Sequence, residues 1–217
     1  MTSERTGEKI ELEPNSKPYL LKRIISDGFD TVLILLIFML LSLLIFSSPL
    51  AKTYNDHVGN CQKAQEEAAE EYGEDKEAVN KALQSSEYYQ NEHFAAELHG
   101  YLLKLLAGAV AEAVVLLAVP LISKDRMTPG KILMGIMPFC PRKQTKASRL
   151  VIFARFTFVL IVDSAFFYLF TGIFTFLLIP VIRLIEMLPN KKNRTVCDVL
   201  TGVTIIEKLS YNGIESI

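Results

Sequence analysis

A few charged side chains lie at the edge of, or inside, long apolar stretches of this 217-residue chain. Arg23, Asp27 and Asp30 follow one another at positions i, i+4 and i+7, so a helix would place all three on one face. A charged group within a membrane span costs about 2.5–3.5 kcal/mol on insertion scales, and such groups usually pair or face water. These three residues therefore predict either an ion-paired structural cluster or a path for protons or cations.

Later apolar stretches carry further charges. Glu112 interrupts one of them, and Arg155 and Asp163 are eight residues apart in another, about 12 Å along a helix axis. Arg183 and Glu186 lie near the end of the last stretch, where long side chains reach the interface at little cost. A pair such as Asp30 with Arg155 would neutralise the deep charges, and the carboxylates would equally suit proton-coupled binding of monovalent cations. The sequence leaves both interpretations open.

The elements that carry these charges are apolar enough to cross a membrane. No charged residue or histidine occurs from Thr31 to Ala51 or from Ser164 to Ile182, and about 20 apolar residues span the roughly 30 Å hydrocarbon core. The length of the first stretch and the acids before it favour a retained helix over a cleaved signal peptide. We expect an all-α fold, a polytopic transmembrane bundle of four helices.

Residues 52–99 have a different composition, with eleven acids against four lysines and helix-like apolar spacing. They predict a small acidic helical insertion, outside the membrane, between helices one and two. The expected segments are an N-terminal tail (1–17), helix one (18–49), the insertion (50–97), helix two (98–123), a basic loop with an interfacial segment (124–149), helices three and four (150–188) and a C-terminal segment (189–217).

The distribution of bases predicts the orientation. The loop 124–149 holds seven Lys or Arg against one Asp, and short basic loops stay on the cytoplasmic side. With four crossings, both termini would be cytoplasmic and the insertion extracytoplasmic, in the plasma membrane. Cys61 would then lie outside and Cys140 and Cys197 inside, so no disulfide could join the two sides.

Three motifs, in order, resemble those of the RDD family of membrane proteins, which is named for an arginine and two aspartates. The first is KRIISDGFD, which contains Arg23 and Asp30. The second, TPGKILMGI from Thr128 to Ile136, is similar to the family's T-P-G-K-x-x-x-G-I stretch. The third, RTVCDVLTGVTII from Arg194 to Ile206, is similar to its H-D-x-x-A-G-T-x-V-V stretch, with Cys197 at the histidine position.

The resemblance implies that these motif residues matter to the family's fold or function. Glycines at 130 and 135 permit a close backbone approach or a turn, and Lys131 could bind lipid phosphates at the membrane surface. Asp198 could cap a short element packed beneath the bundle. Some members of the family have been linked to sodium–proton antiport, which would use the buried carboxylates.

No Walker loop, Rossmann glycine pattern, G-x-S-x-G elbow or H-E-x-x-H helix occurs in the sequence, so we expect no enzyme activity and no cofactor. His57 and Cys61 are four residues apart, which alone does not predict a metal site. The expected partners are the lipid bilayer and a second copy or another membrane protein, not nucleic acid. The sequence favours an accessory or binding protein; the alternative is a small oligomeric transporter, a monovalent cation/proton antiporter.

Overall fold

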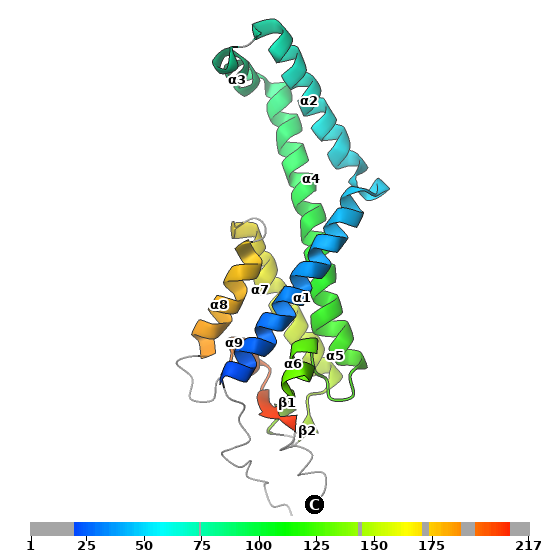
Figure 1. Ribbon diagram of the computed structural model, residues 1–217, viewed down its shortest axis with the longest axis vertical. Helices are drawn as coiled ribbons and strands as arrows, with labels where there is room; N and C mark the ends of the chain where they lie inside the picture. Colours follow the sequence, from blue (N-terminus) through cyan, green and yellow to red (C-terminus); the bar gives the residue numbers. More distant parts are fainter. Residues whose placement is uncertain (1–19, 74, 143–144, 171–173, 188–193, 209–217) are drawn as a thin grey trace, which may run out of the picture. The chain divides into compact units, whose positions relative to one another are not determined.

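The computed structural model describes residues 20–73, 75–142, 145–170, 174–187 and 194–208 (Figure 1). The chain divides into two units, residues 1–35 with 112–217 and residues 36–111, and α1 and α4 run from one into the other. The elements are α1 (Leu20–Phe46), a 3₁₀ turn (Pro49–Ala51), α2 (Lys52–Tyr72), α3 (Lys76–Ser85), α4 (Glu87–Glu112), a π-helical segment (Ala113–Ala118), α5 (Val119–Ile122), α6 (Pro129–Met134), β1 (Ile136–Cys140), β2 (Thr145–Lys146), α7 (Arg149–Phe170), α8 (Phe174–Met187), α9 (Val196–Leu200) and β3 (Thr204–Glu207).

Two helices of the described chain are long and apolar enough to cross a membrane. One is α1, and the other is the continuous helix Glu87–Ile122 formed by α4, the π-helical segment and α5. The second begins well before the expected boundary at residue 98, because the sequence from Glu87 to Val119 contains no proline to interrupt a helix. The expected insertion and the second apolar helix are therefore continuous through α4.

The unit 36–111 is helical throughout its described elements, and polar side chains join α2 to α4. Glu92 Oε2 accepts hydrogen bonds from Asn60 Nδ2 (2.9 Å) and lies 2.7 Å from His57 Nδ1. His57 also stacks on His99, with ring centroids 5.3 Å apart. Within the described residues no group of three His, Cys, Asp or Glu side chains could hold a metal ion. The His57 side chain therefore contacts two residues of α4, Glu92 and His99.

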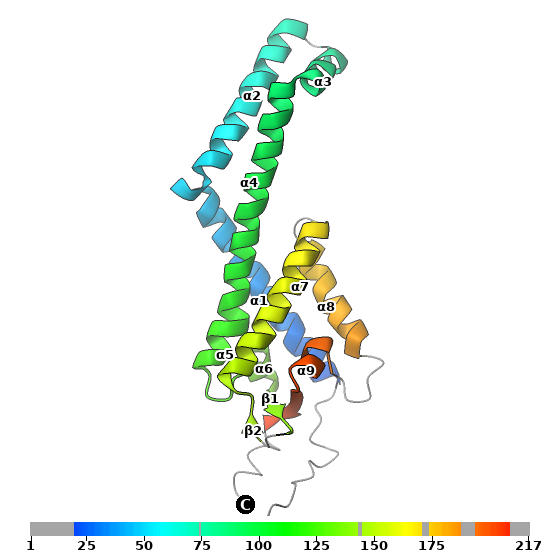
Figure 2. The same ribbon diagram turned by 180° about the vertical axis from the view of Figure 1, so that it is seen from behind.

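In the other unit, α7 and α8 lie side by side in both views (Figures 1 and 2). The expected turn at Thr171-Gly172 lies outside the described residues; α7 ends at Phe170 and α8 begins at Phe174. Helix α6 has a complete set of end signals: Thr128 caps its N-terminus, Pro129 occupies the first turn, and Gly135 follows in the left-handed conformation (φ 65°).

The described chain is mostly helical, as expected, but the all-α expectation missed a small sheet in this unit. The described residues include an antiparallel sheet of order β2-β1-β3, in which Met137 pairs with Ile206 and Phe139 with Lys146. Strand β1 reads IMPFC, an apolar run without alternation, because both of its faces are buried. Proline is rare in central strands, so the presence of Pro138 also kept the sequence from predicting the central position of β1 between β2 and β3. The segment expected to lie along the membrane surface forms the short helix α6, followed by this strand.

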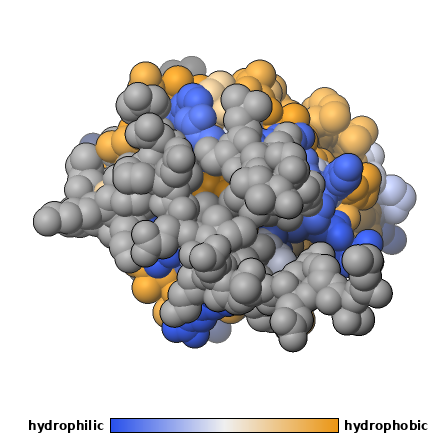
Figure 3. All heavy atoms as spheres, turned by 90° about the horizontal axis from the view of Figure 1, so that it is seen from below, coloured by the Kyte–Doolittle hydropathy of each residue, from blue (hydrophilic) through white to orange (hydrophobic). Residues whose placement is uncertain are grey.

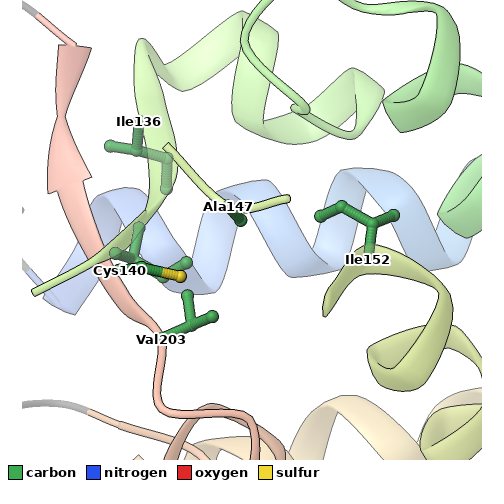
Figure 4. Close-up of a cluster of buried hydrophobic side chains, with 6 residues drawn as sticks. Ile136, Cys140, Ala147, Ile152 and Val203 are labelled. Atoms are coloured by element: carbon green, nitrogen blue, oxygen red, sulfur yellow. The ribbon is translucent and has the colours of Figure 1, made fainter. Parts of the chain in front are cut away.

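The two faces of the sheet pack into separate apolar clusters. Ile136 and Cys140 face one cluster together with Val203, and Met137 and Phe139 face the other. Figure 4 shows the first cluster, where Ile152 projects from α7 toward the sheet. The sheet therefore couples the segment after α6 to the C-terminal strand β3.

Gly135 offers a test of this arrangement. Gly135→Ala should lower the free energy of unfolding by about 1–2 kcal/mol, because an alanine in the left-handed region is strained. The matched control is Gly28→Ala, within α1, where a Cβ meets no atom within 4 Å and helix propensity favours alanine. Thermal unfolding of the detergent-solubilised protein should give a lower midpoint for the first variant only. An unchanged midpoint for Gly135→Ala would contradict the α6–β1 turn.

Candidate functional site

The charged face of α1 is buried where the helix begins. Arg23 is 5% exposed, Asp30 is 2% exposed and Ser26 between them is fully buried. The prediction that Arg23, Asp27 and Asp30 share one face is confirmed, since all three point to neighbours within the same unit. Each of these neighbours belongs to a segment more than 95 residues away in the chain.

Asp30 binds the N-terminal turn of α6. Its carboxylate accepts hydrogen bonds from Thr128 Oγ1 (2.5 Å) and from the backbone N–H of Gly130 (2.7 Å). Lys131 Nζ lies 3.8 Å from the same carboxylate. The first and second family-like motifs therefore meet through one buried side chain.

Gly130 allows the backbones of α6 and α1 to touch. A Cβ at this position would lie 2.1 Å from the carbonyl oxygen of Ser26 and 3.0 Å from Asp30 Oδ1. No side chain fits there without moving the backbone. The close approach expected of this glycine is confirmed, and it brings the N–H of Gly130 within reach of Asp30.

Asp198 joins the third motif to α1 and α7. Its carboxylate lies 2.6 Å from Arg23 Nη2 through Oδ2 and 2.6 Å from Arg155 Nη1 through Oδ1, and the residue is completely buried. Burial alone would raise the pKa of Asp198, but Arg155 and Arg23 outweigh it and hold that pKa well below its usual range. The carboxylate is therefore ionised at neutral pH.

A local capping box orients Asp198. Thr195 Oγ1 accepts from the backbone N–H of Asp198 (3.2 Å), and Asp198 Oδ2 accepts from the backbone N–H of Thr195 (3.1 Å). The pattern T-x-x-D before an apolar run is a known signature of a helix start, so the sequence contained a signal for Thr195. Sequence reasoning missed this residue and Thr128, which caps α6 and binds Asp30.

The predicted pair Asp30–Arg155 is wrong. Arg155 lies 2.6 Å from Asp198 and contacts Thr201 Oγ1 at 3.5 Å, whereas Asp30 is occupied by α6. Helix α6 supplies Asp30 with backbone and side-chain donors, so α7 does not need to neutralise it. Charge complementarity alone did not distinguish between the two carboxylates.

The expectation that Lys131 binds lipid phosphates stays a prediction, and within the described residues its side chain lies against α1. Its side chain is 12% exposed, and Nζ lies 3.6 Å from Asp27 and 3.8 Å from Asp30. The ammonium group points inward because two carboxylates of α1 face the N-terminal turn of α6.

The remaining predicted residues occupy different surroundings. Glu112 is 6% exposed and directly precedes the π-helical segment. The side chain of Asp163, in α7, lies outside the described residues. Cys197 donates a weak hydrogen bond to the carbonyl oxygen of Arg155 (3.9 Å), and burial raises the pKa of its thiol. A protonated thiol there cannot replace the base that a histidine would provide.

The three motifs thus form one cluster at the ends of α1, α6, α7 and α9, which we call the motif cluster (Arg23, Asp27, Asp30, Thr128, Gly130, Lys131, Arg155, Thr195 and Asp198). A further ion pair, Lys22 Nζ to Glu207 Oε1 at 2.7 Å, ties α1 to β3 beside it. In this arrangement the buried carboxylates of Asp30 and Asp198 each lie within 4 Å of a basic group.

Comparison with known families agrees with this geometry. The model of the RDD family matches residues 17–202, which include all three motifs. This chain belongs to the RDD family. No curated protein and no solved structure matches it. Together with the two long apolar helices, family membership indicates a membrane protein.

Gly130→Ala should destabilise the fold by about 3 kcal/mol, the upper end for overpacking, because the new Cβ would collide with the backbone of Ser26. The control is Gly108→Ala in α4, where the nearest atom to a Cβ is 3.9 Å away, on Phe38. Both can be compared by thermal unfolding in detergent. A midpoint for Gly130→Ala equal to that of wild type would show that α6 does not lie against α1.

Asp198→Asn should cost about 3–5 kcal/mol near neutral pH, because two arginines would lose their buried counter-charge. Since the folded-state pKa of Asp198 is lowered, its contribution is present above the usual 3.8 and declines as the pH falls below it. The difference from wild type in unfolding midpoint should therefore narrow in acid. Glu207→Gln, which breaks a partly exposed pair, should cost no more than about 1 kcal/mol. Equal effects of the two substitutions would refute this account.

Proposed function

We propose that this RDD-family chain is a multi-pass protein of the cell membrane with four crossings and both termini in the cytoplasm. The crossings would be α1, the helix Glu87–Ile122, α7 and α8. Seven bases in the loop 124–149 support a cytoplasmic position for the motif cluster, which that loop helps to form. Large apolar side chains are exposed on α1 and α7, including Val32 (57%) and Ile161 (65%), as lipid contact would require. Figure 3 shows the molecule from below relative to Figure 1, the side on which the β-strands lie, and hydrophobic residues are visible around the periphery of this view.

The length of the helix Glu87–Ile122 supports an extracytoplasmic position for the acidic segment. Its 36 residues extend about 54 Å, against roughly 30 Å for the hydrocarbon core. If Ile122 is near the cytoplasmic face, the N-terminal turns of α4 project beyond the opposite face. Those turns carry the partners of α2, such as Glu92 for His57.

The function that we propose is that of a non-enzymatic accessory or scaffold membrane protein. The observation that carries this proposal is that Asp30 and Asp198 each bind several fixed donors. A carboxylate that exchanges protons for cations has to become accessible in each cycle. Releasing Asp198 would leave two buried arginines without a counter-charge, which costs several kcal/mol.

In this proposal the motif cluster maintains the shape of the membrane unit, and partner binding is the task of the acidic segment 52–99. Its eleven acids against four lysines favour a basic partner surface, on another membrane protein or a second copy of the chain. No catalytic group is required.

One observation favours a second function, monovalent cation/proton exchange. Glu112 is a buried acid immediately before a π-helical segment, a geometry frequent at functional sites. An oligomer would be needed to enclose the pathway. Glu112 would then carry the exchange, rather than the carboxylates of the motif cluster.

A flux assay separates the two functions. Purified protein in proteoliposomes should show no dissipation of a pH gradient on addition of sodium or potassium at any pH. In cells, photo-crosslinkers placed at exposed positions of α3 should give a discrete adduct with a partner protein. A photo-crosslinker at Arg142, the control position, should give no such adduct. Sodium- or potassium-dependent flux that is lost in Glu112→Gln and kept in Glu97→Gln, an exposed acid of the same helix, would contradict the scaffold function.

A further inference from the structure

A cavity of about 280 Å³ lies outside the motif cluster, between the first turn of α7, the strands β1 and β2 and the end of α9. The charged side chains that the structure describes in its lining are two bases, Arg142 after β1 and Lys146 in β2. Val151 of α7 and Val199 and Leu200 of α9 form an apolar side. The cavity is therefore amphipathic, and its described lining contains no acid.

The two bases keep donors for a ligand. Lys146 Nζ lies 4.0 Å from Asp125, the limit of an ion pair, and the same carboxylate lies 2.8 Å from Lys208 Nζ. An ammonium group has three donors, so this distant contact leaves Lys146 able to bind a second acceptor. Arg142 is exposed, and its guanidinium offers five N–H donors in a planar fork.

Hydroxyl groups complete the polar side. Thr145 and Ser148 line the cavity beside the bases, and Thr201 lines it from the end of α9. Ser148 Oγ accepts a hydrogen bond from the backbone N–H of Val151 (3.4 Å), which leaves its own hydroxyl hydrogen to donate. Cationic and hydroxyl donors on one side of a cavity suit an oxyanion.

The apolar side continues along α7. Leu150 and Phe153, in the first turns of this helix, are 79% and 53% exposed. In the membrane layout proposed above, the loop 124–149 is cytoplasmic and α7 enters the bilayer after Arg149. The cavity then lies at the cytoplasmic surface of the membrane, where one end of a ligand would be anionic and the other apolar.

The size of the cavity fits a lipid headgroup. At about 30 Å³ per water molecule, 280 Å³ corresponds to about nine waters, enough for a phosphate-containing headgroup but not for its acyl chains. Arginine binds phosphate oxygens through paired, charge-assisted hydrogen bonds, and bases at the cytoplasmic surface attract anionic lipids. We propose that this cavity binds the phosphate headgroup of an anionic phospholipid of the cytoplasmic leaflet, with the acyl chains against the first turns of α7.

Native mass spectrometry of the full-length protein in detergent tests this site, with phosphatidic acid and phosphatidylcholine of the same acyl chains as probes. Wild type should bind phosphatidic acid at least about tenfold more tightly, since two bases face the phosphate. Arg142→Gln and Lys146→Gln should each weaken that binding about fivefold, the contribution of one base near an anionic lipid. Arg142 is exposed, so its replacement leaves the fold intact.

The matched control is Arg149→Gln, an exposed base three residues from Lys146 that does not line the cavity, and it should change the affinity by less than about twofold. Equal binding of the two lipids, or equal losses for Arg142→Gln and Arg149→Gln, overturns the site and leaves only a general attraction to the basic loop. Inorganic phosphate bound as tightly as phosphatidic acid, by titration calorimetry, overturns the lipid as its source.

The proposal rests on the membrane layout but not on the choice between scaffold and exchanger. The flux assay depends on Glu112, which does not line this cavity, so the two results are independent. The layout has its own test: an Arg142→Cys variant in a Cys61→Ser background should resist a membrane-impermeant maleimide added to intact cells. Labelling from outside would overturn the layout and, with it, the cytoplasmic leaflet as the source of the lipid.

Discussion

Neutralisation of the buried carboxylate of Asp198 is the interaction on which the rest of this unit depends. Arg23 reaches it from a position 175 residues earlier, and Arg155 reaches it from α7. A completely buried charge is tolerated only when its partners are fixed, and besides the two arginines the backbone N–H of Thr195 donates a hydrogen bond to Asp198 Oδ2. The first helix, α7 and the C-terminal segment are thereby bound to a single side chain, so the beginning and the end of the chain have to assemble together.

A second constraint acts between backbones. Because Gly130 has no Cβ, α6 lies directly on α1 at Ser26 and places an N–H group against Asp30. The strand β1 follows one turn later and pairs with β3, which continues from α9 and Asp198. The steric contact at Gly130 and the ion pairs at Asp198 therefore reinforce each other through the sheet.

The ion pairs of the motif cluster connect the architecture with the proposed function. The fixed donors around Asp30 and Asp198 support the scaffold function that we propose over reversible proton binding by these two carboxylates. The motif cluster holds three bases, Arg23, Lys131 and Arg155, and three acids, Asp27, Asp30 and Asp198, and ion pairs join members of the two sets.

The sequence by itself determined the mostly helical character of the chain, the shared face of Arg23, Asp27 and Asp30, and the family. These are local properties, readable from apolar runs, helical spacing and short motifs. Only the tertiary structure decided which acid meets which base, and the predicted Asp30–Arg155 pair was wrong. Coulomb attraction does not discriminate between carboxylates; the position of α6, set by the contact at Gly130, does. The sheet was missed for a related reason: β1 is buried on both faces, so its residues show no alternation, and its partner β3 lies about 70 residues away.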